Sequence, residues 1–117
     1  CLEKLEDTDT GRVAYTSVAC RFLDLATCRC RAYDDRQLRA PECLFLTPQK
    51  VRSLKWLPAT CAYRRIAEGR GLAWWHPLVS GNPATVYRAG ISICDRAISI
   101  HHINPEQLEA YIIDLDI

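Results

Sequence analysis

The chain has 117 residues, of which 49% are hydrophobic and 25% are charged, and its formal net charge is +1. This composition is typical of one small globular domain and excludes the disordered, fibrous and collagen-like classes of protein. No run of about 18 apolar residues occurs, which predicts no membrane span, and no secretory signal is recognisable, so we expect a cytoplasmic protein.

The first half of the chain predicts little regular structure. Alternating residues indicate one strand over residues 13–18, within an otherwise turn-rich segment of 46 residues. Thr47 and Pro48 predict the start of a helix, because threonine caps a helix and proline is tolerated in its first turn. That helix should run to about Leu54.

A second helix is predicted over residues 61–68, with Thr60 as its cap and Gly69 just beyond its end. Cys61 would then lie in the first turn, where the helix dipole favours a thiolate. Residues 69–90 are rich in glycine, proline and aromatic residues and indicate an ordered loop.

The C-terminal part predicts two short strands, residues 91–94 and 97–100, around a turn at Asp95 and Arg96. Asn104 and the proline that follows predict a last helix that reaches about residue 113. Together these elements predict a small α+β fold: one loop-rich domain over residues 1–117, with two or three short helices, a minor antiparallel sheet and a cysteine-ligated metal centre.

The cysteines are the most informative feature of the sequence. An odd total of seven cannot pair completely in disulfides, whereas metal ligation has no such constraint. Six of the seven cluster in the first 61 residues, and we expect these six to bind metal: Cys1, Cys20, Cys28, Cys30, Cys43 and Cys61.

Their spacing excludes an ordinary zinc finger or ribbon, because no paired C-x2-C knuckles occur. Cys28 and Cys30 could chelate one ion, or bridge two, from a turn. Soft thiolates select zinc, copper(I) or iron–sulfur clusters, so iron, an iron–sulfur cluster or zinc is the expected cofactor.

The other sulfur and imidazole groups are weaker candidates. Cys94 stands apart on a predicted strand and is expected to pack as a small hydrophobic residue. His76 could supply a nitrogen ligand, but a hydrogen-bonded structural role is favoured, and the adjacent His101 and His102 are expected to be solvated. No signature of a cysteine hydrolase or phosphate-binding loop occurs.

Charge is unevenly distributed along the chain. Residues 1–20 carry −2, residues 21–70 carry +6 and residues 71–117 carry −3. The basic segment 21–70 could bind an anionic or protein partner, or it could offset the charge of a metal–thiolate centre. No aromatic-interleaved motif accompanies it, so we expect no nucleic-acid partner.

Several segments together resemble the YcgN family of bacterial cysteine-cluster proteins. They are residues 1–11, 18–24, 27–33, 41–43, 57–64 and 75–81, and the match covers about residues 1–92. That family belongs to the YkgJ-like group of zinc- or iron-chelating domains, named for a CxxCxxCC motif. The resemblance implies metal binding of undefined physiological purpose.

The resemblance also assigns the cysteines. Cys1 matches the last cysteine of the CxxCxxCC motif, and the downstream family cysteines match Cys20, Cys28, Cys30, Cys43 and Cys61. The three preceding motif cysteines are not in this sequence, so we expect the chain to be N-terminally truncated relative to the family. Some ligands of the metal site would then be missing.

The favoured function is thus a cytoplasmic metal-binding protein that holds iron or zinc through clustered thiolates, rather than an enzyme. A metal-dependent or redox enzyme is the first alternative, with His76, Trp74 and Trp75 nearest to an open coordination position. The second alternative is a metal-stapled adaptor that binds an anionic partner through segment 21–70.

Overall fold

The computed structural model describes residues 1–115, which form two compact units. The first contains Cys1–Phe45 and Ile93–Asp114, and the second contains Leu46–Ser92 and Leu115. Short helices and small sheets make the class α+β, as the sequence predicts.

The first unit begins with an antiparallel hairpin of β1 (Leu2–Glu6) and β2 (Val13–Ala19). The Asp7 carboxylate accepts hydrogen bonds from the backbone N–H groups of Asp9 (2.8 Å) and Thr10 (3.3 Å), which closes the turn. Gly11 adopts a φ of 71°, a conformation that glycine reaches without steric cost. The predicted strand over residues 13–18 is therefore confirmed, and β1 is a strand that the sequence did not predict.

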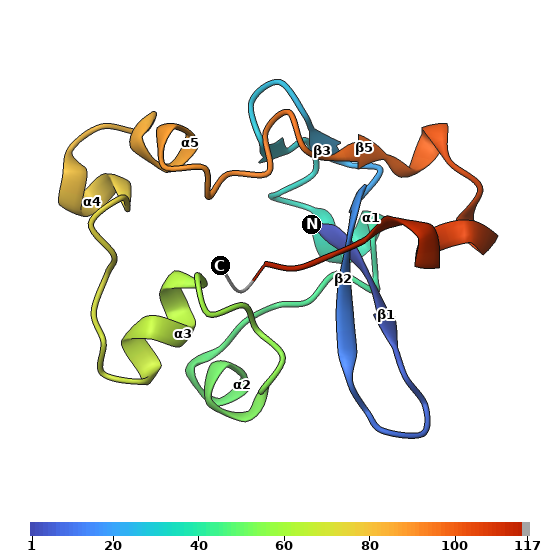
Figure 1. Ribbon diagram of the computed structural model, residues 1–117, viewed down its shortest axis with the longest axis horizontal. Coiled ribbons are helices and arrows are strands. Elements are labelled where there is room, and N and C mark those ends of the chain that lie inside the picture. The colour runs from blue at the N-terminus through green and yellow to red at the C-terminus, as the bar shows by residue number, and fades with distance from the viewer. Residues whose placement is uncertain (116–117) are drawn as a thin grey trace. The chain divides into compact units, whose positions relative to one another are not determined.

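Strand β2 is the centre of the sheet. It pairs with β1, lies parallel to β5 (Ile98–Ser99) and pairs antiparallel with β6 (Ile112–Ile113). Figure 1 shows the C-terminal segment crossing beside this N-terminal hairpin. The first unit is thus assembled from both ends of the chain.

The same strand carries the most buried residues. Val18, Ala19 and Thr16 are all fully inaccessible to solvent. The Thr16 hydroxyl donates to the Glu3 carbonyl oxygen (2.7 Å) and accepts from the Val18 N–H (3.2 Å), so its burial leaves no polar group unpaired.

The apolar core is small. Seven hydrophobic residues are buried among residues 1–115, and four of them are alanines: Val18, Ala19, Leu23, Ala32, Ala40, Leu57 and Ala73. Small side chains bury little apolar area, so covalent or metal cross-links would contribute a large share of the stability of such a chain.

A second hairpin in the first unit carries two of the cysteines. Strands β3 (Leu23–Asp24) and β4 (Arg29–Cys30) pair antiparallel, with Leu23 opposite Cys30. The one-turn helix α1 (Arg36–Arg39) follows. Neither strand was predicted, because two residues are too few to show a period.

In the second unit, α2 (Pro48–Ser53) begins where the sequence predicts. The Thr47 hydroxyl accepts from the Lys50 N–H (3.2 Å), and Pro48 occupies the first turn. Helix α3 (Ala62–Ala67) is also confirmed, but Cys61 is its N-cap residue rather than part of its first turn.

The predicted loop over residues 69–90 contains two one-turn helices, α4 (Pro77–Ser80) and α5 (Thr85–Arg88). The signal for α4 was present in the sequence, because His76 and Pro77 repeat the cap-and-proline pattern of α2. Trp74 is 68% exposed, so it does not pack into a core.

The C-terminal predictions need correction. Residues 91–94 form no strand; they lead into a turn in which Asp95 has a φ of 67°. The predicted strand over residues 97–100 shortens to β5 and runs into the 3-10 helix η1 (Ile100–His102). The last predicted helix is the 3-10 helix η2 (Pro105–Tyr111), kinked at Gln107, with β6 after it.

Among the described residues, none of the helices combines the length and the apolar composition that a bilayer crossing requires.

Candidate metal centre

Six of the seven cysteines lie in the first unit, and their thiols have different surroundings. Cys1, Cys20, Cys30 and Cys43 are free thiols there, and Cys61 is a free thiol in the second unit. Cys28 is joined to Cys94 by a disulfide, with the Cα atoms 6.3 Å apart. Cys94 is therefore a bonded cysteine and not the isolated, packed thiol that its position in the sequence suggested.

Two of the free cysteines sit at the ends of the β3–β4 hairpin and accept hydrogen bonds from the backbone. The Phe22 N–H donates to Cys20 Sγ (3.5 Å), and the Ala32 N–H donates to Cys30 Sγ (3.3 Å). Backbone N–H groups directed at sulfur are the outer-shell contacts that orient and tune thiolate ligands in metal sites. This hairpin is therefore already suited to hold two thiolates.

Cys1 and Cys43 lie close to Cys20. The Cys20 N–H donates to the Cys1 carbonyl oxygen (2.7 Å), at the end of the β1–β2 ladder. Desolvation and the nearby Lys4 lower the pKa of the Cys1 amino group, while the charges of Cys20 and Cys43 oppose that shift. Three of the expected ligands thus share one neighbourhood of the first unit.

Arginine contacts fasten the segment around Cys20 to the segment around Cys43. Arg21 forms an ion pair with Glu42 (3.0 Å) and donates to the Arg39 carbonyl oxygen (3.0 Å). Arg21 and Arg39 also lie over the Phe22 ring, at 4.6 and 5.1 Å from its centroid. The Glu42 backbone N–H and, after it, Arg21 hold the pKa of the Glu42 carboxyl below its usual range.

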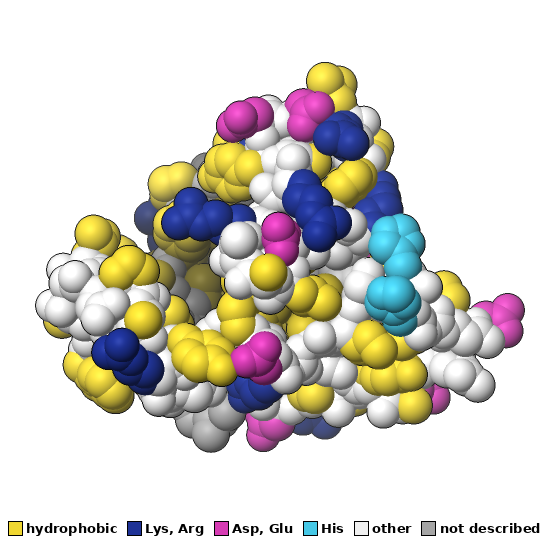
Figure 2. Space-filling view, turned by 90° about the horizontal axis from the view of Figure 1, so that it is seen from above, with side chains coloured by type: hydrophobic (Ala, Val, Ile, Leu, Met, Phe, Trp, Pro, Cys, Tyr) yellow, Lys and Arg dark blue, Asp and Glu magenta, His cyan; other side chains and the backbone are white. Residues whose placement is uncertain are grey.

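Many cations of segment 21–70 have partners within the chain. Arg36 lies over Tyr33, Arg31 is 4.0 Å from Asp24, and the Arg65 side chain donates to the Gly71 carbonyl oxygen. On the face shown in Figure 2, Lys and Arg side chains are interspersed with acidic and hydrophobic ones. No observation here favours the adaptor alternative.

Cys61 is positioned by a separate set of contacts at α3. Its N–H donates to the Pro58 carbonyl oxygen (2.9 Å), and Arg64 donates to the Leu57 carbonyl oxygen just before it. At the other end of the helix, Glu68 pairs with Arg70 (2.6 Å) and Arg64 (3.5 Å). The contacts to Pro58 and Leu57 hold the start of the helix, where Cys61 lies, and the Glu68 pairs hold its end.

The Glu68 pair has a testable pH dependence. The hydrogen bond from Arg70, and then the charges of Arg70 and Arg64, hold the pKa of Glu68 below its usual range. The pKa of Glu68 is lower in the folded state than in the unfolded state. The ion pair therefore stabilises the fold fully at pH values above the unfolded-state pKa. That contribution is lost as the pH falls through the folded-state pKa. We expect the NMR titration midpoint of Glu68 to rise in Arg70→Gln; an unchanged midpoint would contradict the pairing.

The histidines behave as the sequence predicts. His76 is the N-cap of α4, and its Nδ1 accepts from the Leu78 N–H (3.1 Å), which gives it a structural hydrogen bond. His101 and His102 are exposed on η1. A pocket of about 240 Å³ in the first unit is lined by apolar side chains together with Ser17, Arg96 and Asp114, and no cysteine lines it.

The cysteine thiols are suitable metal ligands, but their positions do not form a metal site. Within residues 1–115, no three cysteine, histidine, aspartate or glutamate side chains gather closely enough to hold an ion. The Cys28 sulfur is consumed by the disulfide, so it offers no thiolate. The described residues therefore include free thiols, two of which accept backbone hydrogen bonds, but no assembled coordination sphere.

Comparison with protein families decides the class. The model of the CxxCxxCC family, described as "Putative zinc- or iron-chelating domain", matches residues 1–62. This chain belongs to the CxxCxxCC family. The matched part contains all six cysteines expected to bind metal, whereas Cys94 lies outside it.

Relatives of this CxxCxxCC chain include bacterial proteins named UPF0260. One from Sinorhizobium fredii is 54% identical, and one from Allorhizobium ampelinum is 53% identical; each match covers 97% of this chain, and 73% and 72% of the relatives. A UPF0260 protein from Mesorhizobium japonicum is 53% identical, with 97% of this chain and 78% of the relative covered. No solved structure matches the chain.

Proposed function

We propose that the chain, in its reduced state, chelates zinc or iron through clustered cysteine thiolates. The observation that carries this proposal is the family match over residues 1–62, which spans every cysteine expected to act as a ligand. The proposal treats residues 1–117 as one cysteine-cluster domain, and it keeps the narrower resemblance to the YcgN family as a prediction.

The contacts of the first unit support this proposal. The sulfurs of Cys20 and Cys30 already accept hydrogen bonds from backbone N–H groups. The Arg21–Glu42 ion pair links the segment around Cys43 to the segment around Cys20. A bound metal would need these sulfurs as thiolates, so binding releases protons and strengthens as the pH rises. Cys1, Cys20, Cys28, Cys30, Cys43 and Cys61 remain the proposed ligand set.

The small core gives a physical reason for the family to use a metal. A chain whose buried hydrophobic residues are mostly alanine, among those the structure describes, gains little from apolar burial, and metal binding to the folded state adds directly to the free energy of unfolding. Iron, as an ion or within an iron–sulfur cluster, and zinc are all compatible with thiolate ligands. A cytoplasmic location, where thiols stay reduced, would suit each of them.

The test is the metal content of protein purified without oxygen. We expect close to stoichiometric zinc or iron by elemental analysis, and a thermal unfolding midpoint that falls when a chelator removes the metal. Iron together with acid-labile sulfide and a visible absorption band would identify an iron–sulfur cluster, whereas zinc would give no such band. Reduced protein that takes up neither metal would refute the proposal.

A further inference from the structure

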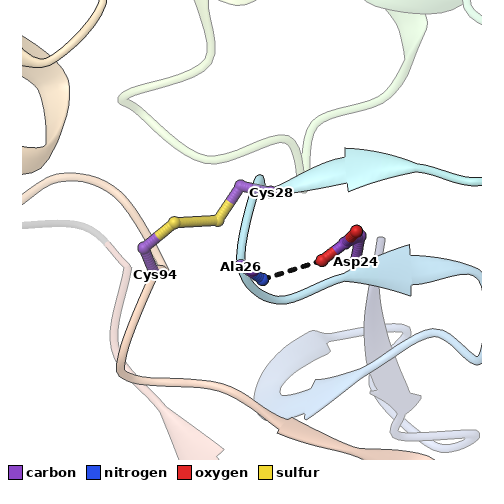
Figure 3. The surroundings of a disulfide bond; sticks show 4 residues. All are labelled: Asp24, Ala26, Cys28 and Cys94. Atoms are coloured by element: carbon purple, nitrogen blue, oxygen red, sulfur yellow. Dashed lines mark hydrogen bonds between the residues drawn. A yellow bond between two sulfur atoms is a disulfide. The ribbon is translucent and has the colours of Figure 1, made fainter.

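The disulfide joins a cysteine inside the family-matched segment to a cysteine outside it. Cys28 lies within residues 1–62, which match the chelating family, and Cys94 lies outside them, 66 residues further along the chain. Figure 3 shows the bridge running from the turn of the β3–β4 hairpin to the segment that leads into β5. One of the expected ligands is thus bound to a cysteine from outside the matched segment.

The backbone on both sides of the bridge is bent to bring the sulfurs together. Cys28 has a φ of 56°, and Asp95, next to Cys94, has a φ of 67°. The Cys28 N–H donates to the Asp24 carbonyl oxygen (2.7 Å), and the Asp24 carboxylate accepts from the Ala26 N–H (2.9 Å). Left-handed conformations are unfavourable for residues other than glycine and are common in segments that switch.

Cys28 and Cys30 are separated by one residue but have different roles in this arrangement. Cys30 lies in β4, and its Sγ accepts from the Ala32 N–H, whereas Cys28 precedes the strand and bonds to Cys94. A sulfur in a disulfide has no thiolate and cannot ligate a metal. Ligation by Cys28 and its bond to Cys94 therefore exclude each other.

In the bridged chain the other thiols are not assembled into a metal site. Five cysteines are free, yet no three metal-binding side chains gather within residues 1–115. With Cys28 held by Cys94, the segment from Cys20 to Cys30 lacks the free thiol that lies between those two cysteines in sequence.

We propose that Cys28 and Cys94 form a thiol–disulfide switch that withdraws Cys28 from the metal site on oxidation and returns it on reduction. The inference rests on the proposed function, and it adds a regulating residue, Cys94, that the family model does not cover. The oxidant is hydrogen peroxide and the reductant is a small dithiol.

The chemistry balances for a dithiol and a peroxide. One thiolate attacks the O–O bond, which forms a sulfenic acid and releases hydroxide that takes up a proton to become water. The second thiol sulfur then displaces the sulfenic oxygen as a second water and forms the S–S bond, so the two sulfurs supply both electrons. A small dithiol reverses the step by exchange, becomes a disulfide itself, and leaves Cys28 and Cys94 as thiols.

By the same coupling, bound metal affects oxidation of the cysteine pair. If oxidation lowers the affinity for metal, then bound metal must oppose oxidation of the pair by the same free energy. Zinc should therefore lower the fraction of bridged chain at a fixed ratio of oxidised to reduced dithiol.

Two serine variants of the 117-residue chain separate loss of the disulfide from loss of a metal ligand. Both Cys94→Ser and Cys28→Ser prevent the bridge, but only Cys28→Ser removes a proposed ligand. Each is compared with the unsubstituted chain for zinc affinity, by competition with a coloured chelator, before and after one equivalent of hydrogen peroxide. Disulfides are mapped in the same samples by peptide mass spectrometry.

We expect the reduced chain and reduced Cys94→Ser to bind zinc alike, and reduced Cys28→Ser to bind at least about 100-fold more weakly, since even changes to outer-shell partners cost 10- to 100-fold. Peroxide should link the Cys28 and Cys94 peptides and release zinc from the unsubstituted chain, while Cys94→Ser keeps its zinc. Equal zinc retention by the bridged and reduced chains, or a different partner for Cys28, would overturn the switch. Failure of the reduced chain to bind zinc or iron would instead refute the proposed function, and the switch with it.

Discussion

Replacing Cys30 by serine is expected to weaken zinc binding by the reduced chain at least about 100-fold. Serine keeps the size of the side chain, but its hydroxyl stays protonated and is a poor ligand for a thiophilic metal. The Ala32 N–H, which donates a hydrogen bond to Cys30 Sγ, would then no longer contact a thiolate ligand. Competition with a coloured chelator, under anaerobic conditions, measures the change.

The matched control for Cys30→Ser is the same substitution at Cys94, outside the family-matched segment, which should leave the affinity of the reduced chain unchanged. A second readout separates ligation from folding. Cys30 is only half-buried, so the metal-free unfolding free energy should change by no more than about 1 kcal/mol. Unchanged zinc affinity in Cys30→Ser would remove Cys30 from the ligand set.

The second large effect is expected for Val18→Ala, which should lower the unfolding free energy by about 2 kcal/mol. Val18 is fully buried at the centre of the sheet, where it pairs with Ile98 of β5, so truncation leaves a cavity that few neighbouring side chains can fill. For a chain of this size the thermal midpoint should fall by about 6–12 °C. Urea unfolding of the reduced, metal-free protein gives the free energy.

Val79→Ala is the control for Val18→Ala, because it removes the same atoms from a side chain that is 55% exposed on α4. Its unfolding free energy should stay within about 0.5 kcal/mol of the original. Equal losses in the two variants would mean that β2 is not the centre of the core.

The elements that could be predicted from the sequence are those with a local signal. Thr47 with Pro48 marks the start of α2 through a side-chain hydrogen bond that is encoded within four residues. Strand β2 was recognisable alone, because residues 13–18 of its sequence alternate. Strand β1 was missed because its lysine and glutamates conceal the alternation, and its pairing with β2 decides its conformation.

The candidate site was predictable in composition but not in geometry. Clustering identified six cysteines, and the family match includes all of them. Nothing in the spacing could pair Cys28 with Cys94, since these cysteines are separated by 66 positions in sequence and their pairing depends on the path of the chain between them, including the positive φ angles of Cys28 and Asp95. The strand predicted over residues 91–94 does not form, although the turn predicted at Asp95 and Arg96 does.

The two-ended assembly of the first unit has a consequence for biosynthesis. Strand β2 emerges from the ribosome early, but its partners β5 and β6 lie about 80 and 95 residues later, so two of its pairings must wait for translation of the distal segment. Such distant pairings are slow to form. Cys94 follows Cys28 by 66 residues, so the bridge between them cannot form until that part of the chain has been translated, and under the proposed function a metal could reach Cys28 before then.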